Sequence, residues 1–150
     1  MSVSEVINQN AVVTDLDAAN KAEVLDALAQ LLFEDGSVTD KQAFIDDVYL
    51  RESEGKTGIG NGVAIPHGKS EVVAKTCIAV AKLKNPIEWE TIDGKPVQVI
   101  ILFAVDGNDK NNYFVKLMSQ VARMLARDGF CSSLMSAKDK DELLELFQNI

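Results

Sequence analysis

The chain has 150 residues, of which 47% are hydrophobic and 25% are charged, as expected for one globular domain with a substantial core. Its formal net charge of −8 at pH 7 argues against a broad nucleic-acid-binding surface, because such surfaces are rich in Lys and Arg. No apolar run is long enough to cross a bilayer, and the N-terminus lacks the features of a signal peptide, so we expect a cytoplasmic protein without direct membrane insertion.

The first part of the chain predicts a short strand followed by a helix. The apolar residues 11–13 form a candidate strand. Residues 20–33 place apolar side chains at helical spacing, which predicts an amphipathic helix. Asp17 or Asn20 is expected to cap the N-terminus of this helix, and Gly36 to follow its C-terminus.

A second helix is predicted directly after Thr39, which is a candidate N-cap residue. Phe44 and other apolar residues share one face of this helix. Gly55 is expected to close it, which places Arg51 and Glu52 in its last turn.

The character of the chain changes after this helix. Alternate glycines between residues 58 and 62 predict an extended loop that leads into the apolar run 63–65. Residues 76–83 predict a strand that is broken by Asn85-Pro86. Residues 97–105 are nearly all apolar, which is typical of a central strand buried on both faces.

The last part of the chain is predicted to be helical, with one helix over residues 111–126 and another starting at Ser136 or Asp139. Helices thus precede and follow a group of strands, which predicts a single three-layer α/β (α+β) domain. The elements do not alternate regularly, so we expect a mixed β-sheet flanked by helices on both faces.

The two cysteines, Cys77 and Cys131, are distant in sequence and form no CxxC pair. The sequence therefore indicates neither a zinc site nor a thiol redox motif. Two buried free thiols are expected, with Cys77 in a strand and Cys131 in a turn, which fits a reducing compartment.

The segment Gly60–Ser70, GNGVAIPHGKS, resembles a phosphate-binding loop at first sight. A nucleotide-binding P-loop needs a glycine separated by four residues from its Gly-Lys-Ser, but Val63 occupies that position here, and a strand-like run follows. A metal site is not favoured either, because His67, the only histidine, has no histidine or cysteine partner at a ligand spacing.

The remaining functional interpretation makes His67 a nucleophile. A neutral imidazole has a free lone pair near pH 7 and can attack phosphorus, forming a reactive N–P bond that suits a group carrier. Loop glycines allow close approach to backbone N–H groups, and an arginine can bind two phosphoryl oxygens. From the residues alone, an ordinary histidine that follows Pro66 in a loop remains an alternative.

Arg51-Glu52 followed by TGIGNGVAIPHGKS, from Thr57 to Ser70, closely resembles the phosphorylation-site signature of the fructose/mannitol-type EIIA domains of the bacterial sugar phosphotransferase system. The resemblance covers essentially the whole chain, so residues 1–150 are identified as one such domain of the fructose-like subfamily. It implies a mixed β-sheet flanked by helices, in agreement with the pattern of apolar residues.

The same resemblance implies a phosphotransferase component with a phosphohistidine intermediate. His67 would accept a phosphoryl group on Nε2 from the phosphocarrier protein HPr and pass it to a cysteine of an EIIB domain, coupled to an EIIC permease. Arg51 matches the arginine that stabilises the phosphoryl group, and no metal or organic cofactor is implied. Nitrogen-type EIIA proteins, which regulate by phosphorylation-dependent protein binding, are the alternative. The resemblance specifies neither the sugar that is taken up nor whether the chain forms a homodimer.

One departure from the family pattern concerns a second histidine near the start of the helix after the central strand. The matching position is about Tyr113 or Phe114, and no histidine is present. Asn112 or Tyr113 is a candidate substitute hydrogen-bond donor. The sequence also contains no EIIB-like cysteine loop, so the EIIB part is expected on a separate polypeptide.

Overall fold

A computed structural model describes residues 2–109 and 112–148. The chain begins with the short helix α1 (Val3–Val6) and continues through strand β1 (Ile7–Leu16), helix α2 (Lys21–Glu34) and helix α3 (Lys41–Glu52). The glycine-rich region forms β2 (Gly58–Gly60), β3 (Val63–Ala64) and β4 (His67–Ser70). The long strands β5 (Cys77–Ile87) and β6 (Val97–Asp106) precede α4 (Tyr113–Leu125), α5 (Phe130–Ser136) and α6 (Lys140–Gln148).

The six strands form one mixed sheet in the order β1-β5-β6-β3-β2, with β4 also paired to β6. β1 runs parallel to β5, β5 runs antiparallel to β6, and β3 and β4 both run parallel to β6. β3 and β4 are therefore two successive segments along one edge of β6, separated by Ile65 and Pro66. His67 is the first residue after this interruption.

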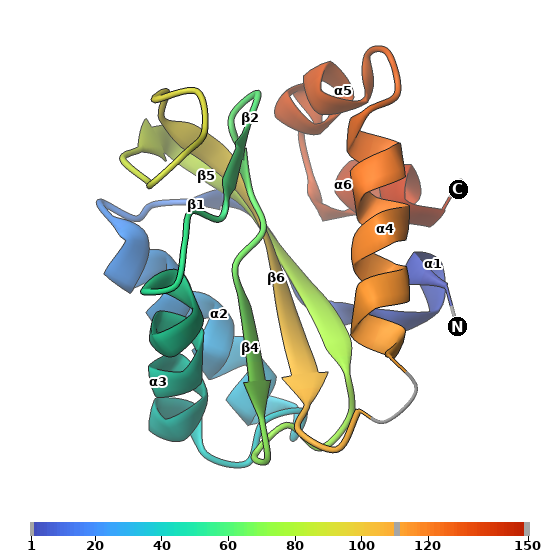
Figure 1. Ribbon diagram of the computed structural model, residues 1–150. Helices are drawn as coiled ribbons and strands as arrows, with labels where there is room; N and C mark the ends of the chain where they lie inside the picture. Colours follow the sequence, from blue (N-terminus) through green and yellow to red (C-terminus); the bar gives the residue numbers. More distant parts are fainter. Residues whose placement is uncertain (1, 110–111, 149–150) are drawn as a thin grey trace.

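Helices cover both faces of the sheet, as predicted (Figure 1). Apolar residues of α2 and α3 form one core with one face, and those of α1, α4, α5 and α6 form a second core with the other face. Alternate residues of β6 enter the two cores, with Ile100 and Leu102 in the first and Ile101 and Phe103 in the second. The predicted three-layer architecture and the doubly buried strand are confirmed.

Several predicted boundaries are wrong, each for a local reason. Asp40 caps α3, because its Oδ1 accepts a hydrogen bond from Ala43 N at 3.1 Å, whereas Thr39 Oγ1 donates to the Val72 carbonyl. β5 continues through Asn85-Pro86 to Ile87, since a register shift after Lys82 accommodates the proline. β1 is also longer than predicted, with ten residues.

The N-terminal cap of α2 is Asn20, which accepts from Glu23 N at 3.0 Å, and Gly36 follows the helix at φ 83°. α5 was not predicted, and Cys131 lies in it rather than in a turn. Cys77 is buried in β5 as expected, whereas Cys131 is only partly buried, and both thiols are free. The predicted start of the helix at residue 111 lies outside the described residues.

The alternate glycines form a tight hairpin rather than an open loop. β2 and β3 pair antiparallel, and the turn residues Asn61 and Gly62 have φ values of 56° and 78°. Positive φ at both central residues is the requirement of the type I′ turn that Asn-Gly favours. This hairpin extends the sheet edge immediately before His67.

Candidate functional site

His67 lies at the point where the edge segment of the sheet resumes after Pro66. Its backbone pairs with Phe103 of β6, and the Pro66 carbonyl accepts a hydrogen bond from Phe103 N at 3.0 Å. The imidazole Nδ1 lies 3.4 Å from the Ile65 carbonyl oxygen. A carbonyl oxygen can only accept, so the tautomer that fits this contact carries hydrogen on Nδ1 and leaves a lone pair on Nε2.

An aromatic ring covers the imidazole. The ring of Phe114, in the first turn of α4, lies with its centroid 4.8 Å from that of His67, at an interplanar angle of 39°. Phe103 supports Phe114 from the side in an edge-to-face contact at 5.7 Å. The position at which the family resemblance leads one to expect a second histidine therefore holds an apolar ring.

The two candidate substitute donors are placed differently. Tyr113 is 37% exposed, and its ring contacts the ammonium group of Lys116 at 5.8 Å. Asn112 is exposed at the start of α4. Among the contacts of the described residues, neither side chain reaches the imidazole, and Phe114 takes the place beside it.

The surroundings of His67 favour its neutral form. Burial is the largest influence and lowers the pKa of the imidazole below its usual value. The hydrogen bond to the Ile65 carbonyl raises the pKa, the positive charge of Arg51 lowers it, and the carboxylates of Glu52 and Glu54 raise it. The net shift is downward, so the imidazole is neutral at pH 7 and has the lone pair that a nucleophile requires.

Arg51 lies in the last turn of α3, as predicted, and is partly buried. Its Nη1 donates a hydrogen bond to the Gly55 carbonyl at 3.3 Å. Its positive charge is one of the influences that lower the pKa of His67, so the guanidinium is near enough to act electrostatically on the imidazole. A guanidinium has five N–H donors in a planar fork, which suits the oxygens of a phosphoryl group.

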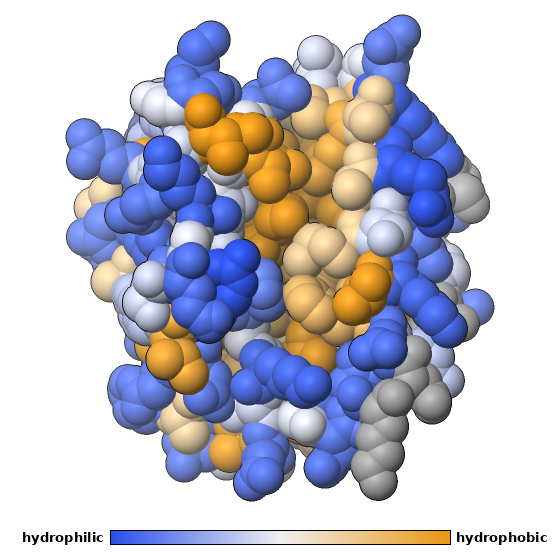
Figure 2. Space-filling view, in the orientation of Figure 1, coloured by the Kyte–Doolittle hydropathy of each residue, from blue (hydrophilic) through white to orange (hydrophobic). Residues whose placement is uncertain are grey.

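An apolar band borders the site. Figure 2 shows apolar side chains gathered in a hollow between the β2–β3 hairpin and α4, with hydrophilic residues around it. The partly buried apolar residues that pack on the second core include Ile59, Ile65, Phe114, Met118 and Met135. The Met135 methyl group lies 2.7 Å from the position that a Cβ would occupy on Gly62, so the hairpin and α5 are closely packed.

The Gly68-Lys69-Ser70 sequence does not form a phosphate cradle. These residues belong to β4 and pair with Ala104, Val105 and Asp106 of β6, rather than opening a helix. A Cβ on Gly68 would lie 2.7 Å from Val48 Cγ2, so this glycine is required for packing against α3.

The described part of the chain holds no group of three or more His, Cys, Asp and Glu side chains that could bind a metal ion. Nor does any helix within the described ranges have the length and apolar character needed to span a membrane.

Two contributors to the site were not predicted from the sequence. One is the backbone carbonyl of Ile65, which orients the imidazole. The other is a hydrogen-bond network that begins at Glu52 and involves Thr57 and Trp89. The only sequence signal for the network is the position of Glu52 directly after Arg51.

Comparison with known proteins places this chain in a family. Residues 5–150 match the family model described as "Phosphoenolpyruvate-dependent sugar phosphotransferase system, EIIA 2". The chain is 32% identical over 145 residues to the PTS system 2-O-alpha-mannosyl-D-glycerate-specific EIIABC component of Escherichia coli (strain K12), which covers 96% of this chain but only 22% of that protein.

Two further relatives match over nearly their full length. The chain is 31% identical over 147 residues to the Nitrogen regulatory protein of Klebsiella oxytoca, covering 97% of this chain and 90% of that protein. The crystal structure of Nitrogen Regulatory Protein IIA-Ntr from Neisseria meningitidis superimposes with a TM-score of 0.87 at 25% identity, covering 97% of this chain and 98% of that one. Sugar-specific components and regulatory proteins are thus both among the relatives.

Proposed function

This chain belongs to the EIIA 2 family of the phosphoenolpyruvate-dependent sugar phosphotransferase system, and on that premise we propose that it carries a phosphoryl group on Nε2 of His67. The observation that supports this assignment most directly is the contact of His67 Nδ1 with the Ile65 carbonyl oxygen at 3.4 Å. It occupies one ring nitrogen and leaves the lone pair on the other. His67 is also the only histidine in the chain.

The proposed reaction is an exchange of one phosphorus bond for another. The lone pair of Nε2 attacks the phosphorus of phospho-HPr, a bond forms between Nε2 and phosphorus, and the bond to the donor breaks. Nδ1 keeps its proton, which stays hydrogen-bonded to the Ile65 carbonyl oxygen, and Arg51 binds the phosphoryl oxygens as their charge redistributes. In the second step, a cysteine sulfur of an EIIB domain attacks phosphorus, and the Nε2–phosphorus bond breaks.

The apolar band beside His67 fits an encounter with protein partners. Nucleophile and phosphorus must approach within about 3–3.5 Å in a defined orientation, which a docked partner can provide. Exclusion of water from the docked site also protects the reactive N–P bond from hydrolysis. We propose that phospho-HPr and an EIIB domain dock here in turn, in the cytoplasm, and that sugar uptake follows through an EIIC permease.

A regulatory role is the second candidate. It is favoured by the match to a Nitrogen regulatory protein over 90% of that protein's length and by the close structural similarity to IIA-Ntr. In that case the phosphorylation state of His67 would control binding to another protein. Sugar transport is favoured by the fructose-like TGIGNG run and by the similarity to the EIIABC component.

A reconstituted relay tests the proposal. The chain is incubated with phosphoenolpyruvate, enzyme I and HPr, and then with candidate EIIB domains. We expect an acid-labile phosphoryl group on His67, no phosphorylation of His67→Ala, and a large rate loss for Arg51→Ala. An unmodified His67 beside an active upstream relay contradicts the phosphoryl-carrier role. Phosphorylation without transfer to any EIIB domain favours the regulatory role instead.

A further inference from the structure

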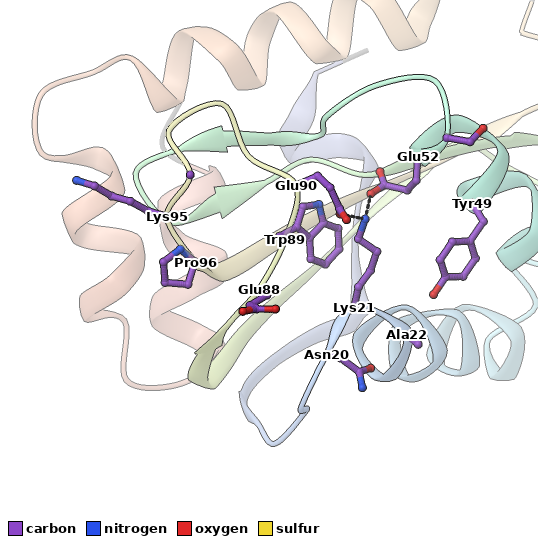
Figure 3. Close-up of a pocket in the computed structure, with 12 residues that line it drawn as sticks. Asn20, Lys21, Ala22, Tyr49, Glu52, Glu88, Trp89, Glu90, Lys95 and Pro96 are labelled. Carbon is purple, nitrogen blue, oxygen red and sulfur yellow. Dashed lines mark hydrogen bonds and ion pairs between the residues drawn. The ribbon is translucent and has the colours of Figure 1, made fainter.

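Three segments of the chain, residues 20–22, 49–53 and 88–96, line a crevice of about 990 Å³, which Figure 3 shows. Lys21, the first residue of α2, extends into this crevice and contacts two carboxylates. Its Nζ lies 2.5 Å from Glu52 Oε1, at the end of α3, and 2.5 Å from Glu90 Oε1, in the segment between β5 and β6. The same ammonium group lies 4.6 Å from the ring centroid of Trp89.

Glu52 is the buried member of this group. Its side chain is 6% exposed, whereas that of Glu90 is 67% exposed. The second carboxylate oxygen of Glu52 accepts a hydrogen bond from Thr57 Oγ1 at 2.6 Å. Thr57 Oγ1 in turn accepts from Trp89 Nε1 at 2.9 Å. Every polar atom of this chain of contacts is thus partnered, which fixes the relative positions of the segments that supply them.

This network is connected to both functional residues. Arg51 directly precedes Glu52, and its guanidinium is bonded to Gly55 in the segment between Glu52 and Thr57. On the other side, the Thr57 carbonyl accepts a hydrogen bond from Ile65 N at 2.9 Å. The carbonyl of the same Ile65 contacts His67 Nδ1 at 3.4 Å. An unbroken series of contacts therefore runs from Lys21 through Glu52 and Thr57 to the imidazole.

We propose that Glu52 and Thr57 are positioning residues, which hold the Ile65 carbonyl against His67 Nδ1 and the Arg51 guanidinium at the Gly55 carbonyl. Lys21 and Trp89 fix the Glu52–Thr57 pair from the other side. The contribution of Glu52 and Thr57 to phosphoryl transfer rests on the proposed function of His67. Their effect on the tautomer of the imidazole does not depend on that function. A network that only stabilises the fold would leave the tautomer of the imidazole unchanged.

Thr57→Val is the principal test, because it removes the hydroxyl group and keeps a similar shape. Nitrogen-15 NMR of the unphosphorylated protein, at a pH where His67 is neutral, reports the hydrogen on each ring nitrogen, and the single histidine makes the signals unambiguous. We expect the Nδ1–H form to dominate in the native chain and the Nε2–H form to increase several-fold in Thr57→Val. The rate of phosphoryl transfer from phospho-HPr should fall about tenfold or more, since small displacements at a reacting centre cost that much.

The structure offers matched controls. Thr57→Ser restores the hydroxyl group and should restore the native tautomer ratio. Thr91→Val makes the same change at another buried threonine, whose hydroxyl bonds the Lys95 carbonyl outside the network, and should leave the ratio unchanged. Glu52→Gln is a second variant and should shift the ratio in the same direction. Glu90→Gln alters the exposed partner of Lys21 and should leave the tautomer ratio unchanged.

The outcomes separate the two proposals. A native tautomer ratio in folded Thr57→Val and Glu52→Gln overturns the positioning role, whatever the transfer rates. If Thr57→Val does not fold, the comparison of the tautomer ratio of His67 in Glu52→Gln with that in Glu90→Gln decides whether the positioning role holds. If the native chain is never phosphorylated but the tautomer shifts as expected, the proposed function fails and the positioning of His67 by the network stands.

Discussion

Replacement of Phe114 by alanine removes the ring that covers His67. In the native protein this ring lies 4.8 Å from the imidazole and 5.7 Å from Phe103, measured between ring centroids. Burial is the largest influence that lowers the pKa of His67. We therefore expect the pKa of His67 to rise toward its ordinary value near 6.5 in Phe114→Ala, because water gains access to the ring.

The same variant should cost moderate stability. Truncation of a fully buried phenylalanine costs about 3–5 kcal/mol, and an aromatic pair contributes about 0.5–1.5 kcal/mol. Phe114 is only partly buried, so we expect a loss of about 2 kcal/mol in the free energy of unfolding. For a chain of this length, that corresponds to a decrease in Tm of about 4–8 °C.

The lowered pKa also makes stability depend on pH. Below about pH 6.5 the unfolded chain protonates its histidine while the folded chain resists protonation, so the unfolded state binds more protons. The contribution of His67 to stability is therefore complete above this pH and is lost as the pH falls toward the lowered pKa of the folded state. In Phe114→Ala this pH dependence should be weaker, because the two pKa values lie closer together.

An NMR titration of the imidazole carbon-bound protons measures the pKa directly, and thermal unfolding at several pH values measures the linked stability. Tyr113→Ala is the matched control, since Tyr113 precedes Phe114 but contacts Lys116 rather than His67. An unchanged pKa in folded Phe114→Ala would refute the argument that this ring desolvates the His67 imidazole.

The remaining predictions concern the proposed binding of phosphoryl oxygens by Arg51 and the packing of β4. Arg51→Lys keeps the positive charge but loses the planar fork, so we expect about a 10–100-fold loss in the rate of phosphoryl acceptance with little change in the pKa of His67. A native rate of phosphoryl acceptance in Arg51→Lys would contradict bidentate binding of the phosphoryl oxygens by Arg51. Gly68→Ala places a methyl group 2.7 Å from Val48 Cγ2 and should destabilise the protein by about 1–3 kcal/mol in chemical denaturation. Lys69→Ala, at the exposed neighbour, should be close to native in the same measurement and serves as the control.

The elements that the sequence predicts well are those with strong local patterns. Residues 97–105 are apolar throughout, so their burial on both faces required no knowledge of the partners. The sequence also predicts α2 and its ends, because Asn20 precedes its apolar pattern and Gly36 follows it. The hairpin of β2 and β3 was not predicted, because its paired segments are two and three residues long and too short to show an alternating pattern.

Only part of the site was accessible from the sequence. His67 and Arg51 belong to one continuous motif, so a local pattern identified them. The contact of His67 with a backbone carbonyl leaves no trace in residue type, because every residue has such a group. Thr57 and Trp89 are 32 positions apart, and their hydrogen bond depends on how the segment between β5 and β6 folds back. Such contacts arise from tertiary packing and require the structure.

The account depends most on the assignment of Nε2 of His67 as the atom that receives the phosphoryl group. Proton–nitrogen correlation NMR of the chain labelled with nitrogen-15 histidine, before and after phosphorylation by phosphoenolpyruvate, enzyme I and HPr, distinguishes the two ring nitrogens. We predict phosphorus on Nε2 and a retained hydrogen on Nδ1, in line with the 3.4 Å contact to the Ile65 carbonyl. Phosphorus on Nδ1, or an unmodified ring beside fully phosphorylated HPr, would contradict the assignment of Nε2 as the acceptor atom.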